Sequence, residues 1–384
     1  MAARECGGSH PRALIVDRRA VLGTDVCRDL KALGWQIDIF CEPGSPALRS
    51  RYFAKRIAAP CLDCAEQYLD ALEAALRRSA YDAMFVCSEE VLQCLAPRLG
   101  SAEYRVFLAP PQETIRLLAG KAGTLSLAAE HHLSVPRTMV PRDEQELLEM
   151  AAVLGYPLVV KGDKGEASEN VRVVHGPAEL APKYRTVLRN ESSYQGRPML
   201  QEFIPGAQYS VGGLYDDGEP LRVCAYRKIF TYPLEGGLTA KAVTERPPRL
   251  LNDAFRMFRA LRYTGLGQIQ FICDQRDGLF KFMEVNPRIW ASIGLSAHAG
   301  VDLFTPYRDL VQGRRIEPDL NFREGVEYQR LTVQLRLIWR RPAHMLNFVR
   351  DCLNSRVHSD IDLTDPGPYI PTVKGLQRFL HRHE

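Results

Sequence analysis

The sequence has no long apolar run and no dense block of like charge. Its 384 residues carry 50 Lys and Arg against 46 Asp and Glu, a near balance that does not favour a nucleic-acid-binding protein. No apolar run approaches the roughly 20 residues of a membrane-spanning helix. No apolar stretch typical of a signal peptide follows the opening MAARECGGSHPR. We therefore expect a cytoplasmic protein with neither nucleic acid nor a membrane as a partner.

Two common cofactor motifs are also missing. The ten cysteines include one CxxC pair, CLDC at 61–64, but no second pair and no Cys-His partner at the spacing of a zinc site. No GxGxxG follows the first apolar run, ALIVD at 13–17, so the dinucleotide-binding fingerprint is absent. Evidence for chemistry must therefore come from another pattern.

The first feature that is present is an alternation of two residue patterns. Within the first 110 residues, apolar runs such as ALIVD and DAMFVC alternate with segments of helical spacing such as CAEQYLDALEAALRRS. This alternation predicts an α/β domain whose parallel sheet is covered by helices. The chain length favours two or three domains, and the double proline at 110–111 marks the end of the first.

The segment KFMEVNPRIWAS, residues 281–292, continues an apolar strand with polar residues. A period of two predicts Phe280, Phe282, Glu284 and Asn286 on one face of that strand. Two aromatic side chains indicate that this face is buried, and burying an unpaired carboxylate costs roughly several kcal/mol. We therefore expect a positive group beside Glu284.

A preceding strand, GQIQF, adds Gln270 across a short turn at RDG. If the two strands pair, Gln270, Glu284 and Asn286 converge at one end of the sheet. Carboxylate and amide oxygens suit Mg²⁺. One carboxylate with two amides leaves much of the ion's charge unbalanced, and phosphate oxygens would supply the balance.

Two lysines upstream fit a phosphate site. Lys161 ends the strand YPLVVK just before the glycine-containing loop GDKGEAS, where a lysine and backbone N–H groups can meet phosphates together. Lys121 lies in an earlier helical segment, LLAGKAGT.

The order of these parts resembles the ATP-grasp superfamily of carboxylate–amine ligase type. The resemblance rests on GK with Lys121, PLVVKGDKGEAS, LQEFIPGAQYSV, and the pair GQIQF and MEVNPR. That last pair is similar to the ATP-grasp halves of the carbamoyl phosphate synthetase large chain. The implied fold is α/β and α+β: an N-terminal parallel-sheet (pre-ATP-grasp) domain, a two-lobed ATP-grasp fold and a C-terminal extension. The implied boundaries are 1–110, 111–200 for the small lobe, 201–320 for the large lobe with the metal site, and 321–384.

The resemblance also implies cofactors and a role for each matching position. The cofactors are ATP and Mg²⁺, with Mn²⁺ as an alternative, and the loop 162–168 would close over the phosphates. The implied nucleotide-binding residues are Lys121, Lys161, Ser168, Gln201, Glu202, Phe203, Ile204 and Gln208. The implied metal ligands are Gln270, Glu284 and Asn286. The implied catalytic residues are Lys161 and Arg288, and the candidates for substrate binding are Arg227, Lys228 and Arg288.

The implied activity joins a small-molecule carboxylate to a small-molecule amine. ATP would convert the carboxylate to an acyl phosphate, and the amine would then displace phosphate. Three departures leave open an ATP-binding subunit or sensor without turnover. Gly120 stands where relatives often have Asp, Gln208 stands where many have an acid, and the phosphate loop is less glycine-rich than is typical. A carboxylase or a kinase-like relative is a further alternative. Residues 321–384 either complete the substrate pocket or mediate homodimerisation.

Overall fold

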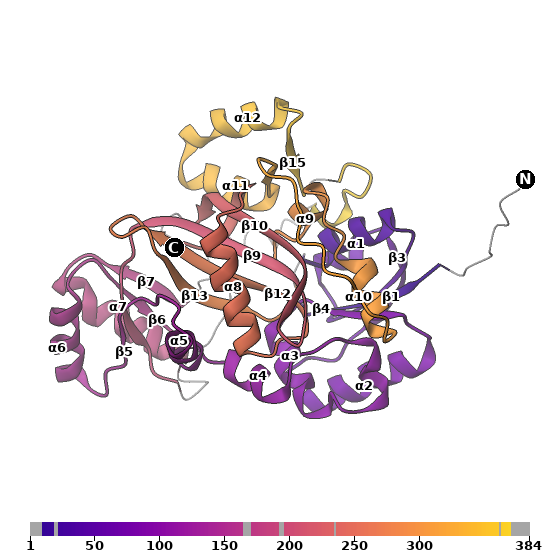
Figure 1. The fold of residues 1–384 in the computed structure, drawn as a ribbon, viewed down its shortest axis with the longest axis horizontal. Coiled ribbons are helices and arrows are strands. Elements are labelled where there is room, and N and C mark those ends of the chain that lie inside the picture. The colour runs from indigo at the N-terminus through magenta and orange to yellow at the C-terminus, as the bar shows by residue number, and fades with distance from the viewer. Residues whose placement is uncertain are drawn as a thin grey trace, which may run out of the picture. The chain divides into compact units, whose positions relative to one another are not determined.

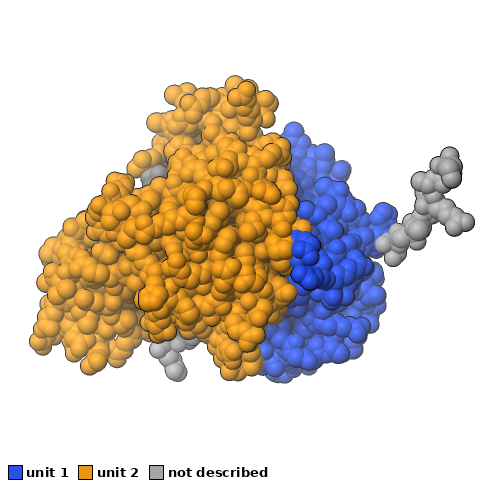
Figure 2. Space-filling model, in the orientation of Figure 1, with its two compact units in different colours: residues 1–108, 302–317, 361–384 blue, residues 109–301, 318–360 orange. Residues whose placement is uncertain are grey.

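The computed structural model describes residues 10–18, 22–163, 170–191, 196–233, 236–360 and 362–369. The chain divides into two compact units that interleave along the sequence (Figure 2). The first unit comprises residues 1–108, 302–317 and 361–384, and the second comprises residues 109–301 and 318–360. No helix among the described residues has both the length and the apolar character needed to cross a membrane.

The first unit is built on a four-stranded parallel sheet in the order β3-β2-β1-β4 (Figure 1). Its strands are β1 Arg12–Asp17, β2 Gln36–Cys41, β3 Phe53–Ala58 and β4 Ala83–Val86. Its helices are α1 Leu22–Ala32, α2 Ala65–Arg78, α3 Glu89–Leu95 and α10 Phe304–Val311. The predicted N-terminal parallel sheet is confirmed, and the apolar runs of its central strands are those of strands buried on both faces.

Helix α10 joins this unit from far along the chain. The hydroxyl of Tyr307 donates a hydrogen bond of 2.9 Å to the carbonyl of Met84 on β4. The ring of Phe304 meets Phe85 edge-on, with 5.3 Å between their centroids. A helix that follows the sheet by more than 200 residues therefore completes its core.

The second unit contains two sheets (Figure 1). The larger has the order β13-β12-β9-β10-β11-β14-β15 and is antiparallel except between β14 and β15. Its strands are β9 Gly206–Asp216, β10 Glu219–Tyr232, β11 Leu238–Thr244, β12 Gly265–Asp274, β13 Phe280–Asn286, β14 Glu327–Gln329 and β15 Val357–Ser359. The smaller, antiparallel sheet has the order β5-β8-β6-β7. Its strands are β5 Thr138–Met139, β6 Leu158–Lys161, β7 Val171–Val174 and β8 Met199–Glu202.

Helices pack against both sheets of the second unit. The helices are α4 Gln112–Leu118, α5 Lys121–Glu130, α6 Glu144–Leu154, α7 Pro177–Glu191, α8 Pro248–Ala260, α9 Gly294–His298, α11 Leu331–Arg340 and α12 Met345–Leu353. The large sheet carries α8 on one face and α11 on the other. Helix α8 buries Leu250, Ala254, Met257 and Phe258 against the large sheet, at the spacing of one helix face. Helices α6 and α7 pack in the same way on the small sheet.

A β-bulge divides the hairpin of β12 and β13 into two parts. Glu284 pairs with Gln270, but the next pair is Phe282 with Phe271, so Met283 has no partner of its own. A bulge of this kind shifts the alternation by one residue. The aromatic side chains therefore join the core beneath α8, whereas Glu284 lies on the opposite face. The prediction that all the alternating side chains of this segment share one face is wrong, because it assumed an uninterrupted period of two.

Candidate active site

Four polar side chains form a block on the face of the large sheet opposite α8. Gln270 lies across from Glu284, and Gln268 lies across from Asn286. The amide nitrogens of Asn286 and Gln270 donate to Oε1 of Gln268 at 3.2 and 3.4 Å. The structure therefore brings together the three predicted metal ligands and adds a fourth residue, Gln268.

Gln268 was not predicted as a site residue. It is 5% exposed, and its Nε2 donates to the hydroxyl of Tyr226 on β10. Burial raises the pKa of Tyr226 to about 12, so this hydroxyl is neutral at physiological pH. The signal was available in GQIQF, since two glutamines spaced by two share a strand face.

Two buried lysines approach this block from different strands. Nζ of Lys228 donates to Oε1 of Gln270 at 2.9 Å and to the carbonyl of Gly237 at 3.3 Å. Nζ of Lys161, at the end of β6, donates to the carbonyl of the bulged Met283 at 3.5 Å. Burial lowers the pKa of each lysine to about 8, and nearby Glu284 opposes that shift.

The half-buried carboxylate of Glu284 is held in its charged form. Burial alone would raise its pKa, but Lys161, Lys121, Lys228 and Arg288 together keep that pKa below its ordinary value. Within the described ranges, neither oxygen of this carboxylate makes a hydrogen bond or an ion pair. The cations therefore stabilise the charge of Glu284 without occupying its oxygens, and both oxygens remain available to a ligand.

Lys121 is placed by the start of the loop that follows β6. Its backbone N–H and its Nζ both donate to the carbonyl of Asp163, at 3.2 and 3.3 Å. The Asp163 carboxylate also accepts from the backbone N–H of Ala122 at 2.9 Å, so it caps the N-terminus of α5. A Cβ atom at Gly120 would lie 3.0 Å from this carboxylate. The contact brings Lys121 near Lys161, and the predicted Ser168 lies outside the described residues.

The predicted adenine-binding residues lie on and after β8. The buried side chain of Gln201 donates to Oγ1 of Thr138 at 2.9 Å. The carboxylate of Glu202 accepts from Arg137, and its backbone N–H donates to the Arg137 carbonyl at 2.9 Å. The side chains of Gln201 and Glu202 therefore already hydrogen-bond to Thr138 and Arg137, at the edge strand of the small sheet.

The remaining predicted nucleotide contacts lie on the connection to the large sheet and at its start. The half-buried Phe203 and the buried Ile204 occupy the connection from β8 to β9. Gln208 is half-buried on β9, two residues before Ser210, which pairs with Gln270. The pleat therefore places Gln208 on the face that carries Glu284.

Two of the candidates for substrate binding, Arg227 and Lys228, lie on opposite faces of β10. Arg227 points away from the polar block, and its Nε donates to Glu245 at 2.8 Å. Lys228, its neighbour, points into the block. Arg288 follows β13, donates through Nη1 to the carbonyl of Ile289 at 3.0 Å, and contributes to the lowered pKa of Glu284. The structure therefore brings Lys228 and Arg288 near Glu284, and leaves Arg227 on the other face.

The ring of Trp290 packs closely on the sheet face that carries the polar block. A Cβ atom at Gly212, which pairs with Gln268, would lie 2.2 Å from the ring of Trp290. Glycine is therefore required for the close approach of that ring to the sheet.

The donor set suits a hard cation rather than zinc. In the described part of the chain, no three His, Cys, Asp or Glu side chains are grouped to hold a metal ion. The block instead offers one carboxylate and amide oxygens, the ligand types that Mg²⁺ accepts together with phosphate and water.

Part of this sequence matches a known protein family and several known proteins. Residues 196–333 match the family described as ATP-grasp in the biosynthetic pathway with Ter operon. A biotin carboxylase of Nostoc sp. is 27% identical over 184 residues, which are 45% of this chain and 40% of that protein. Biotin carboxylase 1 of Bacillus subtilis is 22% identical over 240 residues, which are 58% of this chain and 52% of that protein. The chain spans about half the length of these relatives.

Solved structures show the same fold. The biotin carboxylase–β-γ-ATP complex of Campylobacter jejuni has a TM-score of 0.67 at 17% identity, covering 82% of this chain and 74% of that one. An L-amino acid ligase of Bacillus licheniformis has a TM-score of 0.58 at 17% identity, covering 79% and 75%. An ADP complex of an N5-carboxyaminoimidazole ribonucleotide synthetase has a TM-score of 0.66 at 15% identity, covering 88% and 86%.

The fold, the family match and the ordered motifs agree with one another. The family match over residues 196–333 and the shared fold support membership of the ATP-grasp superfamily, and the resemblance found in the sequence is confirmed.

Proposed function

We propose that this chain is an ATP-dependent carboxylate–amine ligase. The observation that carries the proposal is the Glu284 carboxylate, which four cations keep ionised while its oxygens stay available. Such a carboxylate would hold a divalent cation, which would supply positive charge for phosphoryl transfer. The fold neighbours include an L-amino acid ligase, and a 2-oxoglutarate carboxylase domain of Hydrogenobacter thermophilus was solved with MgADP.

The polar block fits Mg²⁺, with Mn²⁺ as an alternative. We assign Glu284 and Asn286 as ligands, because the Asn286 nitrogen donates to Gln268 and its oxygen is left for the metal. Gln270 would be the third ligand, and its oxygen also accepts a hydrogen bond from Lys228. Lys121 and Lys161 would then neutralise the nucleotide phosphates.

When bound, ATP supplies the phosphoryl group that turns a substrate carboxylate into an acyl phosphate with release of ADP. Lys228 and Arg288 would hold that carboxylate by charge-assisted hydrogen bonds. An amine then attacks the acyl carbon, the C–O bond to phosphate breaks, and the amine loses a proton. With pKa values of about 8, the two buried lysines remain mostly cationic at neutral pH. They can therefore stabilise the charge that moves during transfer.

An ADP-release screen tests the proposal. The full chain is incubated with MgATP and pairs of carboxylates and amines, and products are identified by mass. ADP and phosphate should appear only when both substrates are present. Release of AMP and pyrophosphate would contradict the acyl-phosphate route. No ADP across the panel, with MgATP binding seen by calorimetry, would favour the subunit or sensor without turnover.

A carboxylase is the second candidate, because the curated relatives are biotin carboxylases and pyruvate carboxylases. Its phosphoryl acceptor would be bicarbonate, which has a carboxylate-like group, and biotin would then accept the carboxyl group as phosphate leaves. ADP release that needs bicarbonate and free biotin, and needs no amine, would favour this candidate over the ligase.

A further inference from the structure

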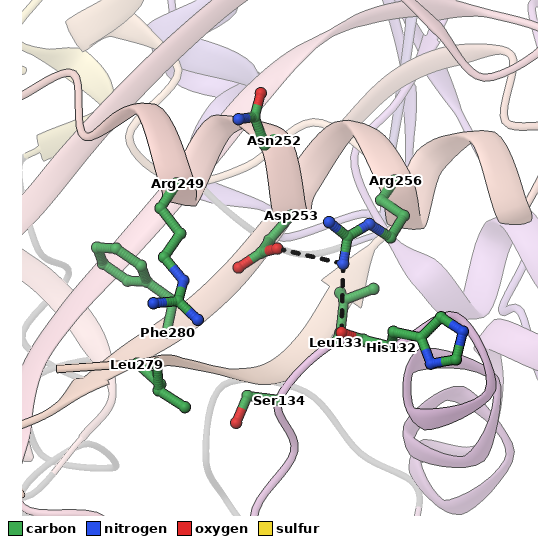
Figure 3. A pocket seen from close by; sticks show the side chains of 9 residues that line it. All are labelled: His132, Leu133, Ser134, Arg249, Asn252, Asp253, Arg256, Leu279 and Phe280. Atoms are coloured by element: carbon green, nitrogen blue, oxygen red, sulfur yellow. Dashed lines mark hydrogen bonds and ion pairs between the residues drawn. The ribbon is translucent and has the colours of Figure 1, made fainter. Parts of the chain in front are cut away.

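A cavity of about 540 Å³ lies on the α8 side of the large sheet (Figure 3). It is lined by one face of α8, by the connection 132–134 between α5 and β5, by Leu279, and by Phe280 at the start of β13. Phe280 belongs to the core beneath α8, whereas Glu284 lies on the opposite face of the sheet beyond the bulge. The cavity is therefore separate from the proposed nucleotide site.

Charges of both signs line the helix wall of this cavity. Arg249, Asp253 and Arg256 follow one another at the spacing of a single helix face, and Figure 3 shows Asp253 between the two arginines. Arg256 lies 3.6 Å from the Asp253 carboxylate and donates to the carbonyl of His132 at 3.2 Å. Arg249 makes no hydrogen bond or ion pair with any residue that the structure describes. The guanidinium of Arg256 is therefore held by protein groups, whereas that of Arg249 can bind a ligand.

The opposite wall is apolar and fixed. Leu133 and Phe280 are buried in the core and present their side chains to the cavity. The carbonyl of Ser134 accepts from the backbone N–H of Phe282 at 2.7 Å, and its hydroxyl accepts from Nζ of Lys281 at 3.0 Å. A preformed cavity with an apolar wall and a few placed charges is typical of a small-molecule site.

We propose that this cavity binds a zwitterionic α-amino acid with an apolar side chain. Arg249 receives its carboxylate, Asp253 receives its ammonium group, and Leu133 and Phe280 pack against its side chain. A simple anion would meet the repulsion of the Asp253 carboxylate, and a simple cation would meet the two arginines. A zwitterion satisfies both signs at once.

The bound amino acid acts as an effector rather than a reactant, because the sheet separates it from Glu284. It contacts the connection 132–134, which leads from α5, and hence from Lys121, to the small sheet. It also contacts β13, the strand that carries Glu284. The site therefore borders the elements that carry the proposed nucleotide contacts.

Calorimetry on the full chain tests this proposal with L-leucine as the probe. The matched analogues are 4-methylpentanoate, which lacks the ammonium group, and 3-methylbutylamine, which lacks the carboxylate. Each analogue should bind at least about tenfold more weakly, since 1.4 kcal/mol is tenfold in affinity and a hydrogen bond to a charged group contributes about that much. Leucine should still bind when the protein is saturated with MgATP.

Three variants locate the site. Arg249→Gln and Asp253→Asn should each weaken leucine binding at least about tenfold. Arg259→Gln is the matched control, because Arg259 lies on the same helix but pairs with Glu219 at 2.8 Å, away from the cavity. It should bind leucine as the wild type does, and thermal melts confirm that all three variants are folded.

Four results would overturn the proposal. The first is no leucine binding up to about 10 mM, a range that already includes very weak sites. The second is equal affinity for leucine and either analogue, and the third is unchanged leucine affinity in Arg249→Gln and Asp253→Asn. The fourth is displacement of leucine by MgATP. None of these outcomes depends on ligase turnover, so the ligase proposal can fail without affecting this one.

Discussion

The two faces of the seven-stranded sheet use the same strands for different purposes. On the face beneath α8, Ile269, Phe271 and Phe282 are buried among apolar neighbours. On the other face of the same strands, Gln270 and Glu284 lie near the two buried lysines. The first face stabilises the fold by removing apolar surface from water, at about 25 cal/mol per Å². The second face costs stability, because it holds cations where water is scarce.

The bulge at Met283 separates these two environments within one strand. It lets β13 contribute aromatic side chains to the core and a carboxylate to the site. Changes on the two sides of this bulge should therefore give different phenotypes, from loss of stability to loss of chemistry.

Phe282→Ala should have the largest effect, and the effect should be on stability. The side chain is fully buried, and truncating a buried Phe typically costs about 3–5 kcal/mol through lost burial and a cavity. Urea unfolding should show the loss, while nucleotide affinity per folded molecule stays near the wild-type value. A stable variant with weakened nucleotide binding would instead place Phe282 on the site face.

Glu284→Gln should come next, and it should affect chemistry. Loss of one preorganised charge in an active site lowers the rate by about 10²–10³-fold, and ADP release in the presence of substrates measures it. The matched control is Arg259→Gln, an exposed change on the far side of the same sheet, which should release ADP at the wild-type rate. Retained activity in Glu284→Gln would remove this residue from the metal site.

The buried lysines should make stability depend on pH. The pKa of Lys161 and of Lys228 is about 8 in the folded chain, against 10.5 ordinarily. Between those values the unfolded chain binds more protons, so the unfolding free energy should rise with pH, by up to about 1.4 kcal/mol per pH unit for each lysine. Urea unfolding of the wild type and of Lys228→Met from about pH 8 to 10 measures the contribution of Lys228. The unfolding free energy of the variant should rise less steeply with pH than that of the wild type. Equal slopes would contradict the lowered pKa.

The smallest effect is expected at Arg227, next to Lys228 but on the core side of the strand. Arg227→Gln removes a partly exposed ion pair with Glu245, which is typically worth about 0–1 kcal/mol. Its KM for the carboxylate substrate should stay within about twofold of wild type, a change below 0.5 kcal/mol. The same KM should rise strongly in Lys228→Gln. A strong rise in Arg227→Gln instead would return Arg227 to the substrate-binding residues.

Much of the fold and part of the candidate site could be predicted from the sequence. The alternating pattern of the first 110 residues predicted the parallel sheet, and the ordered motifs predicted the superfamily. Gln270, Glu284 and Asn286 were predicted to converge, and they do. Of the residues that were missed, Gln268 could have been found from the spacing of the two glutamines in GQIQF. Asp163 is recognised only through its contacts with Lys121 and Ala122, which lie far from it in the chain.

By itself, the sequence determined the types of elements, the order of the motifs and the residue chemistry available to the site. These features depend on residues that are neighbours along the chain, so a period and a motif suffice to predict them. Only the tertiary structure decided that Met283 forms a bulge, that Lys228 and not Arg227 joins Glu284, and that α10 completes the first unit. Each of these depends on register or packing between distant segments, and a one-residue shift in register exchanges the two faces of a strand.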